Sequence, residues 1–145
     1  MKTKLVAVLG ILVIMVAMGA CARVEANKDA SVIVPMDEFT SSKQITRQVE
    51  LEVGQRLDVI LGSNPSTGYS WTETALLSDA AVISQTGHAY VEPGKTTQSL
   101  VGAAGHEHWT FIALQAGTSK ITMSYARPWE AGAVAWTFEL TVVVK

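Results

Sequence analysis

The stretch ITRQVELEVGQRLDVIL, residues 45–61, carries the clearest fold signal in the chain. Its first half alternates apolar and polar side chains with a period of two, the pattern of a β-strand with one buried face. Gly54 ends that alternation, and a second apolar run starts at Arg56. Two strands joined by a short turn, without a helical spacing of apolar residues, favour an all-β domain.

Similar short runs lie elsewhere in the chain, one before this stretch and the others after it. They lie at residues 31–34, 69–74, 81–84, 108–114, 120–126 and 134–144, separated by clusters of Gly, Pro, Asn and Ser. Residues 74–81 could form one short turn of helix, but no window of about a dozen residues carries a helical stripe. We therefore predict an all-β sandwich or barrel of about seven to eight strands, not a βαβ fold.

The N-terminal residues predict export. Lys2 and Lys4 precede an uncharged apolar run, residues 5–20, which has the layout of a signal peptide and is short for a membrane span. Met18-Gly19-Ala20-Cys21 resembles a bacterial lipoprotein signal, in which Cys21 would become the lipidated N-terminus. The alternative is an ordinary cleaved signal with a cysteine nearby by chance.

These features predict a division of the chain into three parts. Residues 1–20 are expected to be a lipoprotein-type signal peptide, residues 21–36 a tether, and residues 37–145 the folded domain. The protein is then exported to the cell envelope and held on a membrane by its lipid, on the outer-membrane or periplasmic side if the cell is Gram-negative.

Charge and cysteine content exclude several classes of protein. Of the 11 Lys and Arg residues, two lie in the signal, so the exported part carries nine against 13 Asp and Glu, a net charge of −4. Nucleic-acid binding needs clustered basic charge, which the exported part lacks, so it is not expected. A single cysteine cannot form an internal disulfide, so the stability of the domain must come from its apolar core.

Three segments are candidate binding loops. In GSNPSTGYSW, residues 62–71, Pro65 restricts the backbone and Gly68 can adopt a positive φ, so the Ser66 and Thr67 hydroxyls are expected to point outward. In QSLVGAAGH, residues 98–106, small side chains let the backbone approach a partner closely. In YARPWE, residues 125–130, the chain turns at a proline and exposes a tryptophan.

Together and in this order, the three segments resemble the chagasin family of inhibitors of papain-like cysteine peptidases. The resemblance covers residues 37–145, with Ser66 where Thr is commoner and Ala103-Ala104 inside the Gly-rich segment. It implies an immunoglobulin-like β-sandwich whose three binding loops, at one end, enter the active-site cleft and inhibit reversibly without a covalent bond. The peptidase-binding residues that it implies are Asn64, Pro65, Ser66, Thr67, Gly68, Tyr69, Leu100, Val101, Gly102, Ala103, Ala104, Gly105, Arg127, Pro128 and Trp129.

The same resemblance implies how the loops divide the cleft. The first lies over the catalytic Cys–His pair, the Gly-rich loop follows the substrate groove, and the third packs against the far wall. The partner is thus a papain-like peptidase of the same cell or a foreign one. We expect a monomer without a cofactor.

Individual aromatic and basic residues have alternative interpretations. Trp71, Trp109 and Trp136 lie in predicted strands and are expected in the core, whereas Trp129 follows a proline in a loop and is expected to be exposed for binding. Arg127 either pairs with a group of the partner or braces its own loop. The Tyr69 ring could pack under its loop, so a direct role is open.

Other functions have less support. His106 and His108 would share one face of a strand, but without a third ligand at a useful spacing polar surface is favoured over a metal site. An enzyme is not expected, because the loops offer neither two facing carboxylates nor a Gly-x-Ser-x-Gly nucleophile. A membrane-tethered adhesion or scaffold module remains the alternative, although it would not account for the Asn-Pro and Arg-Pro-Trp loops.

Overall fold

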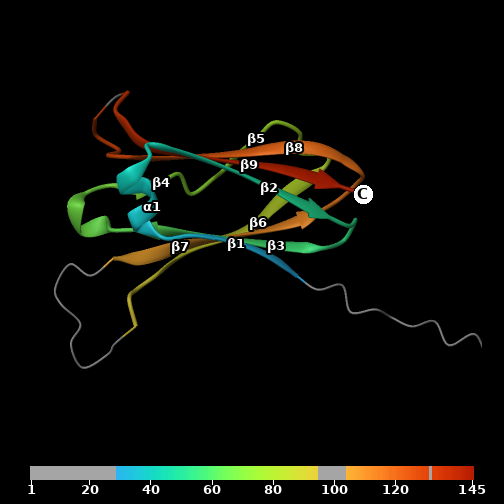
Figure 1. Cartoon of the computed structure of the whole chain (residues 1–145), viewed down its shortest axis with the longest axis horizontal. Coiled ribbons are helices and arrows are strands. Elements are labelled where there is room, and N and C mark those ends of the chain that lie inside the picture. The colour runs from blue at the N-terminus through green and yellow to red at the C-terminus, as the bar shows by residue number, and fades with distance from the viewer. Residues whose placement is uncertain (1–28, 95–103, 131) are drawn as a thin grey trace, which may run out of the picture.

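The computed structural model describes residues 29–94, 104–130 and 132–145. Within these ranges the chain forms two packed β-sheets and a short helix (Figure 1), which confirms the predicted all-β sandwich. The strands are β1 (Ala30–Val34), β2 (Gln44–Leu51), β3 (Arg56–Ser63), β4 (Ser70–Trp71), β5 (Leu76–Leu77), β6 (Ile83–Val91), β7 (Gly105–Ala113), β8 (Gly117–Ala126) and β9 (Val134–Val144). The helix is α1 (Met36–Ser41), and a 3-10 turn, η1, spans Pro65–Thr67.

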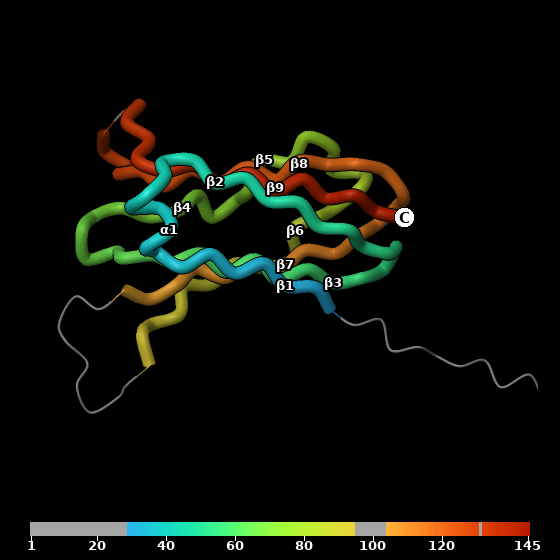
Figure 2. Tube along the Cα trace, in the orientation of Figure 1, coloured from blue at the N-terminus to red at the C-terminus, as the bar shows by residue number. Residues whose placement is uncertain are grey.

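The two sheets differ in strand order. The first has the order β1-β3-β7-β6, and the second has β2-β9-β8-β4, with β5 also paired to β8. Most neighbours are antiparallel, but β1 runs parallel to β3 and β2 runs parallel to β9. Each parallel pair includes an edge strand: β1 lies at the edge of the first sheet and β2 at the edge of the second. The chain passes from one of these edges to the other through α1 (Figure 2).

The core lies between the sheets and follows the period-two pattern of the strands. In β7 every second residue from Gly105 to Ala113 is buried. Trp71 and Trp109 are buried as predicted, whereas Trp136 is only partly buried and stacks on Tyr125 with ring centroids 4.8 Å apart. Burial of apolar surface supplies most of the favourable free energy of folding, so this apolar core can stabilise the domain without a disulfide.

The folded part begins earlier than residue 37. β1 pairs with β3 along its whole length, and its inward-facing Val32 and Val34 pack against the core. The predicted tether, residues 21–36, is therefore wrong from Ala30 onward, because the apolar run in this segment buries its inner face as an edge strand. After the strand, α1 places Phe39 against Trp71, with ring centroids 4.9 Å apart, and so fills the end of the sandwich.

Two other local predictions also differ from the structure. Residues 74–81 contain β5 and turns in place of a turn of helix. β6 continues to Val91, well beyond the predicted segment 81–84, and a register shift between Gln85 and Gly87 interrupts its alternation. A β-bulge places two residues of one strand against one of its partner, so the period-two signal is lost there.

The strand ends that three loops connect lie at the same end of the sandwich, on the left in Figure 1. Loop 1 (residues 64–69) joins β3 to β4, loop 2 (residues 92–104) joins β6 to β7, and loop 3 (residues 127–133) joins β8 to β9. The start of β1 and the C-terminus lie at the opposite end. Among the described residues no helix is long and apolar enough to cross a membrane.

Candidate functional site

Loop 1 is closed by hydrogen bonds within itself. The Thr67 amide donates to the Asn64 carbonyl at 3.2 Å, and the Gly68 amide donates to the Pro65 carbonyl at 2.9 Å. Gly68 has φ 80°, the left-handed conformation that glycine adopts without a Cβ clash. Pro65 stands at the first position of the 3-10 turn, where its fixed φ is compatible with the helix. The loop is thus rigid for local reasons that its sequence contains.

Ser66 and Thr67 are exposed, and their hydroxyl groups bond to Asn64 within loop 1. Thr67 Oγ1 donates to the Asn64 carbonyl at 2.7 Å, and Ser66 Oγ donates to Asn64 Oδ1 at 2.5 Å. Short polar side chains in turns commonly bond to nearby groups of their own loop. These bonds further restrict the conformation of loop 1.

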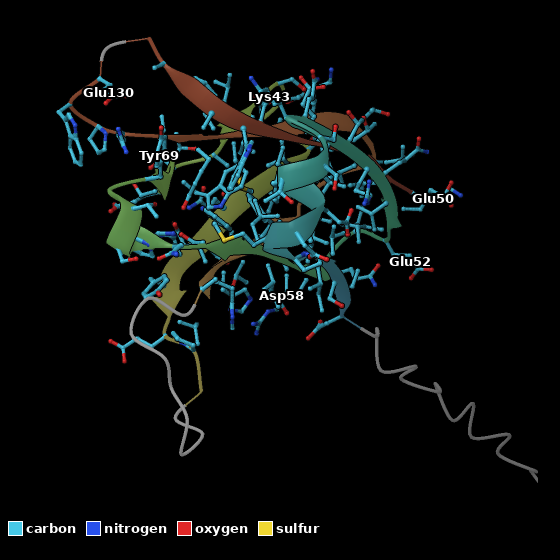
Figure 3. All side chains as sticks on the ribbon, turned by 60° about the vertical axis from the view of Figure 1, so that its left-hand side comes forward. Lys43, Glu50, Glu52, Asp58, Tyr69 and Glu130 are labelled. Carbon is cyan, nitrogen blue, oxygen red and sulfur yellow. The ribbon has the colours of Figure 1, made fainter. Side chains whose placement is uncertain are left out.

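Loop 3 is braced against loop 1 by Arg127. Its guanidinium carbon lies 4.5 Å from the centroid of the Tyr69 ring, and its Nη1 donates to Glu130 Oε1 at 2.9 Å. The hydrogen bond to Glu130 raises the pKa of Arg127 above its ordinary value. Tyr69, which Figure 3 shows beside the loop of Glu130, stacks on Tyr125 with ring centroids 5.5 Å apart. Of the two roles considered for Arg127, the structure supports the second, in which its side chain braces loop 3 through Glu130 and Tyr69.

Trp129 is a large, exposed apolar residue of loop 3. Its residue surface is 69% exposed, as the sequence predicts for a binding residue. Loop 3 turns at Pro128, where the Glu130 amide donates to the Arg127 carbonyl at 3.1 Å. The ring lies over Gly68, since a Cβ built on Gly68 would come within 2.6 Å of Trp129 Cη2. Loops 1 and 3 are therefore in direct contact, and the contact requires a glycine.

Most of the predicted contacts of loop 2 lie outside the described residues, namely Leu100, Val101, Gly102 and Ala103. Ala104 is exposed at the entry to β7. Gly105 is buried, and a Cβ there would come within 2.5 Å of the Val91 carbonyl oxygen. Gly105 thus serves the close approach of β6 and β7, and it offers no side chain to a partner.

A buried carboxylate, Glu107, lies beneath the loop end and was not among the candidate site residues from the sequence. Glu107 is 3% exposed and accepts from Ser63 Oγ at 2.7 Å and from the Trp71 amide at 3.1 Å, both through Oε1. Its Oε2 lies 2.8 Å from His88 Nε2. The sequence does contain a signal for the burial of Glu107. It lies two residues before Trp109 in the same strand, so both side chains face inward.

The two candidate metal ligands lie in β7 on its partly exposed face. His108 Nε2 is 2.9 Å from Asp58 Oδ1, to which Arg56 Nη2 also donates at 3.0 Å. Burial by itself would raise the pKa of Asp58, but the hydrogen bonds from His108 and Arg56 outweigh it and hold the pKa below its ordinary value. Asp58 lies on the outer side of the sandwich (Figure 3). Within the described ranges, no group of three or more His, Cys, Asp or Glu residues could hold a metal ion.

The fold and the loop end define a class of protein, an immunoglobulin-like sandwich that presents rigid loops at one end. A family model described as "Chagasin family peptidase inhibitor I42" matches residues 50–142, more than half of the chain. The chain belongs to this family, as its three motifs indicated.

Curated relatives and solved structures agree with the family. Amoebiasin-1 of Entamoeba histolytica is 33% identical over 99 residues, covering 67% of this chain and 89% of the relative. Chagasin of Trypanosoma cruzi is 32% identical over 79 residues, covering 53% of this chain and 69% of the relative. The solution structure of Amebosin is similar with a TM-score of 0.56 and 28% identity, covering 81% of this chain and 99% of that chain. PbICP-C, solved in complex with falcipain-2, shares the fold with a TM-score of 0.60 at 21% identity, covering 80% and 99%.

Proposed function

We propose that this protein is a reversible, non-covalent inhibitor of papain-like cysteine peptidases and not an enzyme. The observation that carries the proposal is the contact of loops 1 and 3 at one end of the sandwich, through Trp129 over Gly68 and Arg127 over Tyr69. Family membership supports it, as does the complex of the structurally similar PbICP-C with falcipain-2. We expect one monomer to bind one peptidase.

Loop 1 would block the catalytic centre without being cleaved. A peptidase cuts a peptide that it holds extended, with the scissile carbonyl positioned for attack by the catalytic thiolate. The turn at residues 65–67 and the left-handed Gly68 keep loop 1 out of an extended conformation. A bound segment that cannot reach the near-attack geometry reacts slowly, so the loop occupies the cleft as an intact plug.

The other two loops would supply affinity on either side of loop 1. Trp129 offers a large exposed ring, and aromatic anchors commonly dominate the binding energy of an interface. The small residues of loop 2, from Gly102 to Ala104, would lie along the substrate groove as an extended peptide does. Because loops 1 and 3 are already ordered against each other, docking costs them little conformational entropy.

The test is a titration of the domain without its signal peptide into papain, followed with a fluorogenic substrate. We expect a loss of peptidase activity that is reversed on dilution, with the inhibitor recovered uncut. Alkylating the catalytic thiol with a small group should weaken binding without abolishing it. If several papain-like enzymes stay fully active at micromolar inhibitor, the tethered-scaffold function replaces this one.

The second part of the proposal is that Cys21 is lipidated and holds the exported protein on the cell envelope. The lipobox-like residues before Cys21 support this, and they predict a signal peptide that ends at residue 20. β1 begins at the end of the sandwich opposite the three loops, so an N-terminal anchor would leave the loops facing away from the membrane (Figure 1). Such a protein would meet peptidases that are free in the surrounding compartment.

Cys21→Ala tests the anchor. We expect the variant to leave the membrane fraction or to stop maturing, because the lipid attachment site is gone. Mass spectrometry that finds an unmodified Cys21 in the wild-type protein, or a cleavage site elsewhere, would contradict the proposal.

A further inference from the structure

We infer that Glu107 is a positioning residue for inhibition, because it holds both ends of loop 1 from inside the sandwich. The inference rests on the proposed function and extends it to a residue outside the three loops. Glu107 lies in β7, on the strand that follows loop 2, with its side chain between the two sheets.

The hydrogen bonds of Glu107 bracket loop 1 in sequence. Ser63, which donates to Oε1, is the last residue of β3 and directly precedes the loop. Trp71, whose amide donates to the same oxygen, belongs to β4, directly after the loop. One carboxylate oxygen therefore joins the two strands from which loop 1 projects. Those strands belong to different sheets, so no strand ladder fixes their spacing at this end.

A carboxylate suits this position because the Ser63 hydroxyl and the Trp71 amide donate to it and a ring nitrogen of His88 lies beside it. An ionised carboxylate has only acceptor sites, and it can accept several hydrogen bonds at once. The Ser63 hydroxyl, the Trp71 amide and the ring nitrogen of His88 all lie within 3.1 Å of its oxygens. Burying a charge is costly unless it is hydrogen-bonded, so the three partners together explain why an acidic residue is tolerated in the core.

The same carboxylate connects loop 1 to the strands that flank loop 2. In the ladder, Glu107 pairs with Leu61 of β3 on one side and with Tyr90 of β6 on the other. His88, its third partner, also lies in β6, with its ring 4.9 Å from that of Trp109. A shift of Glu107 would therefore alter the base of loop 1 and the entry to loop 2 together.

A local role predicts that two buried serines behave differently. Ser63 and Ser119 are both 0% exposed, and each makes a hydrogen bond through its hydroxyl. Ser119 lies in β8, near the end of the sandwich that is opposite the loops, and accepts from the Asp79 amide. Ser63→Ala removes a buried bond to Glu107, whereas Ser119→Ala removes a part-buried bond of another buried serine away from the loop end.

The experiment measures the inhibition constant against papain well below the thermal midpoint of each variant. We expect Glu107→Ala to weaken inhibition by about tenfold or more, and Ser63→Ala by about three- to tenfold, because loop 1 is less ordered before docking. Glu107→Gln keeps a carbonyl oxygen for Ser63 and Trp71, so it should stay within about threefold of the wild type. Ser119→Ala should lower the thermal midpoint and leave inhibition unchanged.

Amide hydrogen exchange supplies a readout that does not depend on inhibition. Ser63→Ala should speed exchange at the amides of Thr67, Gly68 and Trp71, and Ser119→Ala should not. If the wild type fails to inhibit any peptidase while this exchange pattern holds, the proposed function fails and the positioning of loop 1 stands. If the wild type inhibits and the folded variants Ser63→Ala and Glu107→Ala inhibit as strongly as the wild type, Glu107 has only a structural role and the inference is overturned. A loss with Glu107→Gln equal to that with Glu107→Ala would also overturn it.

Discussion

Truncating Trp129 to alanine should weaken inhibition by about thirtyfold or more. The residue is 69% exposed in the free protein, and a tryptophan buries up to about 250 Å² when fully covered, so about 170 Å² is available to a partner. At about 25 cal/mol per Å² this area corresponds to an upper bound of about 4 kcal/mol. Part of that gain is lost to ordering at the interface, which leaves about 2 kcal/mol or more, the size of a typical hot spot.

The assay for Trp129→Ala compares inhibition constants for papain and thermal midpoints of the free proteins. Leu76→Ala is the matched control, because Leu76 is 72% exposed and lies on β5, outside the three loops. We expect Trp129→Ala to change the inhibition constant with little change in midpoint, and Leu76→Ala to change neither. Inhibition by Trp129→Ala at the wild-type level, or an equal loss in Leu76→Ala, would refute the assignment of Trp129 as the anchor.

Three further variants test the core, the loop contact and the outer ion pair. Trp71→Ala should lower the free energy of unfolding in urea by about 3–5 kcal/mol, since its ring packs between Phe39 and Tyr125; a value near zero would contradict its core position. Gly68→Ala should weaken inhibition, because Gly68 has a positive φ and a Cβ there would clash with the Trp129 ring. The loss should be smaller when Trp129 is already alanine, and strictly additive losses of the two variants would contradict the contact. Asp58 has a lowered pKa in the folded state, so its contribution to stability is present at neutral pH and is lost as the pH falls below about 4. Asp58→Asn should therefore be less stable than the wild type at neutral pH and approach it in acid, whereas a constant difference in urea midpoints would refute this.

Features that depend on neighbouring residues were predictable from the sequence. The strand at Val134–Val144 was predicted with the bounds that the structure has, because apolar and polar residues alternate from Trp136 to Val142 within a run rich in β-branched residues. The turn of loop 1 follows from Pro65 and Gly68, whose φ preferences are properties of the residues themselves. The exposure of Trp129 likewise follows from its place after a proline in a loop.

Features that depend on distant partners required the folded chain. The sequence left two roles for Arg127, because Tyr69, which packs against its guanidinium, lies on a different loop. Glu107 shares the strand parity of core residues, yet its hydrogen-bond partners come from β3, β4 and β6, and no local pattern predicts which residues they are. Local sequence sets the backbone preference of each residue. The partners of a buried carboxylate depend instead on the tertiary topology, because it determines which strands lie within hydrogen-bond distance.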